Sequence, residues 1–241
     1  MALLEVERLC KRYGAVVVAD DISFSFDHRS CLGLIGPNGA GKSSLFNMLT
    51  GIISPDSGEV RLNNKDIRRV PPHLRARLGI VRAFQIPRPF TQLTVYENVL
   101  TAAMYGAGLS AEDASRHAAG VLDQTGLRVH ADQPAGHLRL LDRKRLELAK
   151  AMASKAELLL LDEIASGLTD QEVGSIVDLI AILKSTHAII WIEHIPHALH
   201  AVADRIMVLH FGRKLLDGPP SEVLANPLVQ EIYMGMPADA S

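Results

Sequence analysis

One short segment constrains the fold of this chain more than any other feature of its sequence. Residues 36–43 read Gly-Pro-Asn-Gly-Ala-Gly-Lys-Ser. The apolar run Cys31 to Ile35 comes before this segment and predicts a buried strand, and Lys42 to Thr50 follows it with helical character. The pattern G-x-x-x-x-G-K-[ST] between a strand and a helix is typical of a phosphate-binding loop. An ordinary glycine turn is the alternative, and it leaves the lysine and serine at these spacings unexplained.

The residues of this loop have the chemistry that a nucleoside triphosphate requires. Glycines let the backbone amides of residues 39–44 point at a β-phosphate, and the positive end of the helix dipole adds to their attraction. Lys42 is expected to bridge the β- and γ-phosphates, and Ser43 to hold Mg²⁺. We therefore expect ATP and Mg²⁺ as cofactors. The predicted nucleotide contacts are Gly36, Pro37, Asn38, Gly39, Ala40, Gly41, Lys42, Ser43 and Ser44.

A second apolar run ends in two carboxylates. Leu158 to Leu161 predicts a buried strand, and Asp162 and Glu163 follow it directly. Ligands of open α/β sheets gather at the carboxyl ends of the strands, so both side chains are expected near the phosphates. Asp162 suits the magnesium shell, and Glu163 suits activation of the attacking water. Strands often end in charged turns, and it is the phosphate-binding loop that favours the functional interpretation.

The rest of the chain alternates between apolar strands and helices. Ile22 to Phe26 alternates apolar and polar residues, which predicts a strand with one solvated face, and Ala188 to Ile192 predicts another buried strand. Helices are expected at Thr94 to Tyr105, Glu112 to Thr125 and Asp142 to Ser154, and the first two form a helical insert. This alternation predicts an α/β fold with a parallel sheet.

Composition excludes several classes of protein. The chain has 241 residues, 48% of them hydrophobic, which is enough for a substantial core. Its formal net charge of -2 lacks the positive excess that binds phosphate backbones, so nucleic acid is not expected as a partner. Cys10 and Cys31 have no metal-ligand spacing and are expected to be free thiols.

No stretch of the sequence predicts a membrane span or a secretory signal. The N-terminal segment Met1 to Gly14 lacks a long apolar run, and no segment reaches the roughly 18 consecutive apolar residues that a spanning helix needs. Any association with a membrane is therefore expected to depend on a partner protein.

Two further polar residues stand out, Gln85 after residues 81–84 at the junction with the helical insert, and His194 after the predicted strand at residues 189–193. Either residue alone would be interpreted as an ordinary loop or edge residue. The phosphate-binding loop, Gln85, Asp162-Glu163 and His194 nevertheless resemble, in this order and spacing, the ATP-binding cassette (ABC) ATPases. The resemblance covers essentially the whole chain.

The resemblance implies an α/β fold of the P-loop NTPase type, with a RecA-like core, an antiparallel β subdomain and an inserted helical subdomain. A single ABC ATPase domain is expected over residues 1–241, with the nucleotide-binding core at 1–85 and 155–241 and the helical subdomain at 86–154. Members of the family work as head-to-tail dimers that hold ATP at two interfacial sites.

The resemblance also implies roles for single residues. Tyr13 would stack on adenine, although a packed residue at the end of the first strand is the alternative. Gln85 would sense the magnesium ion and the attacking water, Glu163 would polarise that water, and His194 would contact the γ-phosphate. Catalysis is thus expected from Glu163, His194, Gln85 and Lys42, and the metal ligands are expected to be Ser43, Gln85 and Asp162.

Four segments look like the branch of the family that takes up branched-chain amino acids and amides. They are Arg82 to Gln85, Thr94 to Val99, Glu193-His194 and the tail Asn226 to Gly235. The chain resembles the larger of the two ATPases of such importers. This implies a second ATPase subunit in a heterodimer, transmembrane permease subunits, an external solute-binding protein, and a cytoplasmic location on the inner face of the plasma membrane.

The sequence departs from the family at three places. The signature loop, usually Leu-Ser-Gly-Gly-Gln, is Leu138 to Asp142 here and has no glycine. Asp142 is expected to cap the following helix and to repel phosphate, while Arg139 could compensate in part. Ile164 replaces a proline, and Thr169 replaces an aspartate for which Asp170 could substitute. We expect one working ATP site and one slow or regulatory site.

Three other functions are alternatives to transport. A soluble ABC protein without a transport role should have tandem cassettes or a long coiled-coil insert, which this sequence lacks. A small-molecule kinase would need a lid and an acceptor site, and would not need His194. A regulatory subunit with weakened catalysis is suggested by the altered signature, but Lys42 and Glu163 argue against it.

Overall fold

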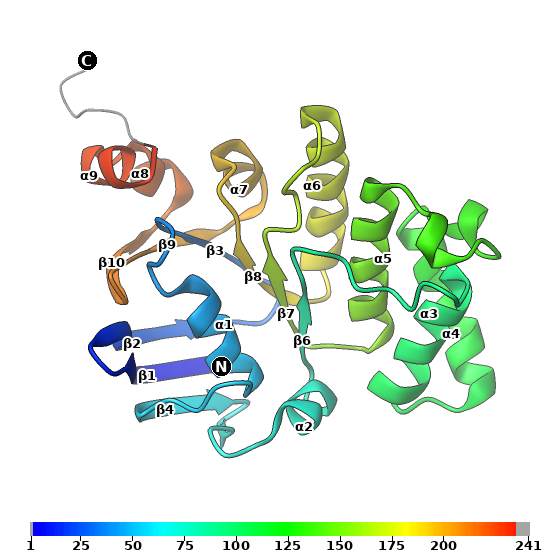
Figure 1. Ribbon diagram of the computed structural model, residues 1–241, viewed down its shortest axis with the longest axis horizontal. Coiled ribbons are helices and arrows are strands. Elements are labelled where there is room, and N and C mark those ends of the chain that lie inside the picture. The colour runs from blue at the N-terminus through cyan, green and yellow to red at the C-terminus, as the bar shows by residue number, and fades with distance from the viewer. Residues whose placement is uncertain (1, 235–241) are drawn as a thin grey trace.

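The computed structural model describes residues 2–234, which form two β-sheets surrounded by helices (Figure 1). The larger sheet has six strands in the order β10-β9-β3-β8-β7-β6. Strands β9, β3, β8, β7 and β6 are mutually parallel, and β10 pairs with β9 in the antiparallel direction. The strands are β3 (Cys31–Ile35), β6 (Ile80–Ala83), β7 (Leu158–Asp162), β8 (Ala188–Ile192), β9 (Arg205–His210) and β10 (Arg213–Gly218).

The smaller sheet is antiparallel and has four strands in the order β2-β1-β4-β5. The strand predicted at residues 22–26 is part of a longer strand of 11 residues that begins at Val16. A shift in its pairing with β1 coincides with Asp21 at φ 56, so a β-bulge interrupts the alternation. The solvated face predicted for residues 22–26 is confirmed by exposed Ser25. The strands are β1 (Leu4–Tyr13), β2 (Val16–Phe26), β4 (Ser57–Leu62) and β5 (Lys65–Asp66).

Helices cover the six-stranded sheet and extend beyond its β6 edge, where α3, α4 and α5 gather at the side farthest from the small sheet (Figure 1). Thr94 and Thr169 begin α3 and α6 with capping boxes. The predicted helix at 94–105 is α-helical only to Thr101 and continues as a π-helical turn, η1. The elements are α1 (Lys42–Thr50), α2 (Pro72–Arg77), α3 (Val95–Thr101), η1 (Ala102–Gly106), α4 (Ala111–Gln124), η2 (Arg128–His130), η3 (Ala135–His137), α5 (Leu140–Ala153), α6 (Asp170–Lys184), α7 (Pro196–Val202), α8 (Pro220–Ala225), α9 (Pro227–Val229) and η4 (Gln230–Met234).

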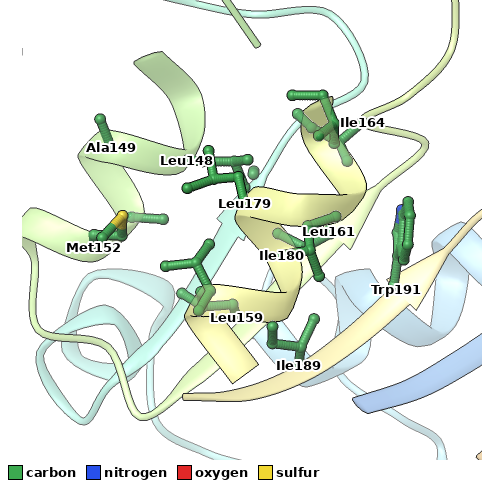
Figure 2. Packing of buried hydrophobic residues seen from close by; sticks show 14 of the residues in the cluster. Leu148, Ala149, Met152, Leu159, Leu161, Ile164, Leu179, Ile180, Ile189 and Trp191 are labelled. Atoms are coloured by element: carbon green, nitrogen blue, oxygen red, sulfur yellow. The ribbon is translucent and has the colours of Figure 1, made fainter. Parts of the chain in front are cut away.

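Strands β7 and β8 are buried on both faces, which explains their continuous apolar sequences. Alternate side chains enter two separate core clusters, one beside α5 and α6 and the other beside α1. In the first cluster Leu161 and Trp191 pack with Ile180 of α6 (Figure 2). The packing fixes the carboxyl ends of both strands, where the polar residues follow.

No helix within residues 2–234 combines the length and the apolar character that crossing a bilayer requires. Both cysteines are free thiols, as expected, with Cys31 buried at the start of β3 and Cys10 partly exposed in β1.

Candidate active site

The glycine-rich loop lies between β3 and α1 and is packed against the backbone on both sides. Gly36 has φ 148, and a Cβ there would lie 2.1 Å from the carbonyl oxygen of Leu209. Gly41 has φ 103, and its Cβ would lie 2.2 Å from the carbonyl oxygen of Val18 in β2. Only glycine fits these two positions, because a side chain would clash with fixed backbone. The small sheet therefore helps to shape the loop.

Lys42 turns its ammonium group back over this loop. Its Nζ donates to the carbonyl oxygens of Gly36 at 2.5 Å and Pro37 at 3.0 Å. Burial lowers the pKa of Lys42, and the nearby carboxylates of Glu163 and Asp162 act in the opposite direction. Helix α1 begins at Lys42, and no side chain of the described residues caps its first amides. The loop thus offers backbone donors and one cation to a phosphate chain.

Asp162 ends β7 and is paired with an arginine from the neighbouring strand. Its carboxylate accepts a hydrogen bond from Arg82 in β6, and the Asp162 residue is only 9% exposed. The same guanidinium donates to Asn47 Oδ1 of α1 at 2.7 Å and lies over the Phe84 ring, 5.0 Å from its centroid. Arg82 therefore fixes the side-chain position of the predicted metal ligand. Sequence reasoning assigned Arg82 no role, because its partner lies 80 residues away.

Glu163 and Gln85 are in direct contact, as their predicted shared role requires. Gln85 Nε2 donates to Glu163 Oε2 at 2.7 Å. Glu163 has φ 46, a left-handed conformation uncommon for this residue type, and its backbone N–H donates to the Ile192 carbonyl at 2.8 Å. The turn after β7 is thus tied to β8 and presents the Glu163 carboxylate towards the loop of Gln85. Strain of this kind clusters at functional sites.

His194 follows β8 and is oriented by the preceding residue, Glu193. The imidazole is 55% exposed, and its Nδ1 lies 3.3 Å from Glu193 Oε1. Glu193 is 1% exposed and also accepts the backbone N–H groups of His194 at 2.8 Å and Ala165 at 3.2 Å. Burial raises the pKa of Glu193, and these backbone N–H donors oppose the rise. Glu193 links the His194 turn to the turn that contains Glu163.

Tyr233 near the C-terminus donates a hydrogen bond from its Oη to the Glu193 carbonyl oxygen at 2.9 Å. Burial raises the pKa of its phenol. We expect Tyr233→Phe to lower the free energy of unfolding by about 1 kcal/mol, since one partly buried hydrogen bond is lost. Chemical denaturation measures the change. Tyr96→Phe is the control, because Tyr96 Oη lies 2.8 Å from Ser115 Oγ in an exposed pair. Equal losses in the two variants would contradict a specific role for Tyr233.

Tyr13 lies at the end of β1, and half of its side chain is exposed. Lys11 Nζ lies 5.3 Å from the centroid of its ring. The residue is therefore not buried in the core. The next strand, β2, contacts the glycine loop through the Val18 carbonyl, so the hairpin that bears Tyr13 adjoins the loop. Tyr13 forms no hydrogen bond with the other predicted site residues.

The segment Leu138 to Asp142 differs from the sequence-based expectation. Helix α5 begins at Leu140 and not at Asp142, and the residue at the N-cap position is Arg139, whose side chain makes no capping bond. The prediction that Asp142 caps the helix is wrong. The Asp142 carboxylate lies in the first turn, 3.5 Å from Arg145 Nη1 and 3.7 Å from His130 Nε2. The carboxylate therefore lies beside Arg145 and His130, and it does not accept a hydrogen bond from the first amides of the helix.

The sequence also departs from the family pattern at Ile164 and Thr169, and both residues have a defined place in the structure. Ile164 is fully buried in the core cluster beside α5 and α6 (Figure 2). Thr169 is the N-cap of α6, and its hydroxyl oxygen accepts from the Glu172 backbone N–H while Glu172 Oε2 accepts from the Thr169 N–H. Asp170 is exposed in the first turn of the same helix.

Lys144 is the second residue that sequence reasoning missed. It lies on α5, is 2% exposed, and its Nζ donates to the Gln85 carbonyl oxygen at 2.5 Å. Burial lowers the pKa of Lys144, and the carboxylates of Glu193 and Glu163 oppose the shift. In the sequence this residue is one of three consecutive basic residues, 143–145, which read as a solvated helix face. Helix α5 is therefore attached directly to the loop that presents Gln85.

The fold and the site together define a P-loop nucleotide-binding protein. A parallel sheet carries, at the carboxyl ends of β3, β7 and β8, a glycine loop with a half-buried lysine, two carboxylates and a histidine. Residues 19–166 match the family model of the ABC transporter family. The chain belongs to this family, and the resemblance seen in the sequence is confirmed.

Comparison with known proteins gives the same result over almost the full length. The chain is 35% identical to the high-affinity branched-chain amino acid transport ATP-binding proteins BraF of Pseudomonas aeruginosa and LivG of Escherichia coli, over 97% of this chain and 98% of each relative. It is 31% identical to the lipopolysaccharide export system ATP-binding protein LptB of Escherichia coli, over 98% of both chains.

A solved structure with a closely similar fold supports the predicted fold class. The ADP conformation of an ATP-binding cassette of an ABC transporter superposes with a TM-score of 0.88 at 29% identity, and covers 98% of this chain and 100% of its own. A cassette of this kind therefore accepts a nucleotide on the same architecture. The predicted ABC type of P-loop fold is confirmed.

Proposed function

We propose that this chain binds MgATP and hydrolyses it as the ATPase subunit of an importer for branched-chain amino acids, amides or related small solutes. The observation that carries the proposal is the contact of 2.7 Å between Gln85 and Glu163, at the strand edge that also carries the glycine loop. The names of the relatives that are 35% identical supply the solute class. Retention of Lys42 and Glu163 argues against a regulatory subunit that has lost catalysis.

Each residue of the site has a separate role in the proposed hydrolysis of ATP. Lys42 and the amides of the loop bind and orient the β- and γ-phosphates. Glu163 orients the attacking water and accepts its proton, while Gln85 positions the Glu163 carboxylate. His194 donates to the γ-phosphate from a ring whose other nitrogen is held by Glu193.

Mg²⁺ fits the oxygen-bearing side chains of this edge. Ser43, Asp162 and Gln85 would hold the ion, and hard oxygen donors of this kind are what it prefers. When bound, it neutralises charge on the phosphate oxygens. Arg82 keeps the Asp162 side chain in place. The exposed ring of Tyr13 would take the adenine by stacking.

The proposed partners follow from the arrangement around Gln85. We assign residues 86–154 to a helical subdomain and the flanking residues to the nucleotide-binding core. At their junction Ile86 is 72% exposed and Phe90 is 55% exposed, so an apolar surface adjoins the active site. This surface suits a helix of a permease subunit on the cytoplasmic face of the membrane, with an external solute-binding protein delivering the solute. Purification of the tagged chain from native membranes tests this, and recovery without any permease would contradict it.

The segment Leu138 to Asp142 supports an asymmetric pair of ATPase subunits. Leu140 is 43% exposed at the start of α5, where the family has a glycine that lets the backbone approach the γ-phosphate of the opposite subunit. A leucine at this position keeps that backbone at a distance. We propose that the ATP bound by this chain faces an intact signature in a different subunit, and that the second site is slow.

Mixed dimers test the asymmetry. Glu163→Gln in this chain should remove most of the ATP turnover of the complex, because it disables the working site. The corresponding substitution in the partner should leave most of the turnover, since that site already faces Leu140. Phosphate release by the purified transporter measures both. Equal losses from the two substitutions would contradict the asymmetry.

A further inference from the structure

A cavity separate from the glycine loop lies at the opposite, amino-terminal ends of strands β3, β7 and β8 of the six-stranded sheet. It has a volume of about 640 Å³ and is bordered by the start of β8 at Ala188, by residues 155–157 before β7 and by the turn at 28–29 before β3. The nucleotide-site residues follow the other ends of these strands, which are five residues long, or roughly 16 Å. The cavity is therefore separate from the ATP site.

Two cations at this cavity are not neutralised. Arg29 and Lys155 are exposed, and neither forms an ion pair with any residue in the range 2–234. The carboxylate of Glu157 also borders the cavity, and its Oε2 accepts from Asn63 Nδ2 at 2.9 Å. One carboxylate and two cations leave a positive excess, which suits a ligand that bears a carboxylate of its own.

Three histidines also border the cavity. His187 Nδ1 lies 3.1 Å from the Leu183 carbonyl oxygen and 2.7 Å from Thr186 Oγ1. A carbonyl can only accept, so the contact with Leu183 favours the tautomer that carries the proton on Nδ1. Burial lowers the pKa of His187, which favours the neutral ring, and Nε2 is an acceptor in that neutral tautomer. The Nε2 atom of His117 is buried and has no partner among the described residues. His28 completes the set.

The remaining wall is mainly apolar and combines two parts of the molecule. It consists of Val121 and Gln124 of α4, Met152 of α5, Thr186, and Ala156 and Ala188 beside the sheet. No group of three or more histidine, cysteine, aspartate or glutamate side chains in the described chain is placed to hold a metal ion. The histidines are therefore hydrogen-bonding groups, and the apolar wall suits an aliphatic ligand body.

We propose that this cavity binds a small aliphatic α-amino acid as a regulatory ligand. Arg29 and Lys155 pair with its carboxylate, His187 Nε2 and Glu157 accept from its ammonium group, and the apolar wall holds its side chain. A bound ligand contacts α4 and α5 on one side and the sheet edge on the other, so it stabilises their packing. The inference does not depend on the proposed transport role, because binding is measured on the chain alone without nucleotide.

Calorimetric titration of the full chain tests the site with three probes of similar shape: L-leucine, isocaproate, which lacks the ammonium group, and isoamylamine, which lacks the carboxylate. Leucine should bind, isocaproate more weakly, and isoamylamine not at all. Lys155→Asn should weaken leucine binding about tenfold or more, because a charge-assisted hydrogen bond is lost. Asparagine tolerates the left-handed backbone at this position, where φ is 53.

Arg8→Asn is the matched control, since Arg8 is also an exposed cation in a left-handed conformation, with φ 47, and lies in the small sheet. It should leave leucine binding unchanged. Absence of leucine binding at millimolar concentration would overturn the proposal, and so would an equal loss in the two variants. Binding of isoamylamine as tight as that of leucine would overturn the assigned role of the cations.

Discussion

Replacing Glu163 by glutamine is expected to reduce ATP turnover by about 100-fold or more, because the carboxylate that we propose accepts the proton of the attacking water is lost. Glutamine has the same shape and still offers an oxygen to Gln85 Nε2, which lies 2.7 Å from the carboxylate. The turn after β7 should therefore keep its structure. Phosphate release measures turnover, and calorimetry should find ATP bound about as tightly as in the unchanged chain.

The ATP turnover of the unchanged chain and of Glu163→Gln must be compared in the complete transporter as well as in the isolated chain. In the head-to-tail arrangement proposed above, a homodimer would place Leu140 opposite both bound nucleotides, so the isolated chain is expected to turn over ATP slowly. Glu112→Gln on α4 is the control for loss of a carboxylate, because Glu112 is 87% exposed and pairs only with Arg116 in that helix. Brisk turnover that survives Glu163→Gln would mean that another group activates the water.

The glycine loop and the two carboxylates could be located from sequence because their signals are local. The loop needs Gly36 and Gly41 at fixed spacing from Lys42, and the strand before Asp162 is continuously apolar because it is buried on both faces. The groups that orient these residues could not be found in this way. Arg82 lies 80 residues from its partner, Lys144 lies 59 from Gln85, and Tyr233 lies 40 from Glu193. Such contacts exist only after folding.

The difference between local sequence signals and contacts formed only on folding also explains which strands and helices could be predicted from the sequence. The buried strands β3, β7 and β8 of the large sheet were predicted, whereas β4, β5, β6, α2 and α7 were not. The strand Ser57–Leu62 includes glutamate and arginine, and the helix Pro196–Val202 has only seven residues, too few for a clear apolar period. The start of α5 was misplaced because aspartate is a favoured N-cap, while the helix begins after Arg139.

Replacing Lys144 by methionine is the second change with a large expected effect. Methionine fills a similar volume, but it leaves the Gln85 carbonyl without its donor and removes the cation beside Glu193 and Glu163. We expect the free energy of unfolding to fall by roughly 2–3 kcal/mol, since a charge-assisted hydrogen bond to a partly buried carbonyl is lost. Turnover should fall about tenfold, because a loop that shifts slightly no longer positions its catalytic groups. Denaturation curves and phosphate release measure the two effects.

Lys150→Met is the control that distinguishes the positioning of Gln85 by Lys144 from a general effect of removing a positive charge from α5. Lys150 also donates to a loop carbonyl, that of Arg88 at 3.0 Å, but it is partly exposed and lies six residues, or about 1.7 turns, farther along α5. Its Nζ also pairs with Glu147, which is 4% exposed, so Lys150→Met should lower stability as well, but it should leave turnover intact. If Lys144→Met lowers stability but leaves kcat unchanged at a temperature where the chain is folded, Lys144 does not position Gln85. A fall in kcat with little change in KM would instead mean that α5 controls the catalytic glutamine through this one ammonium group.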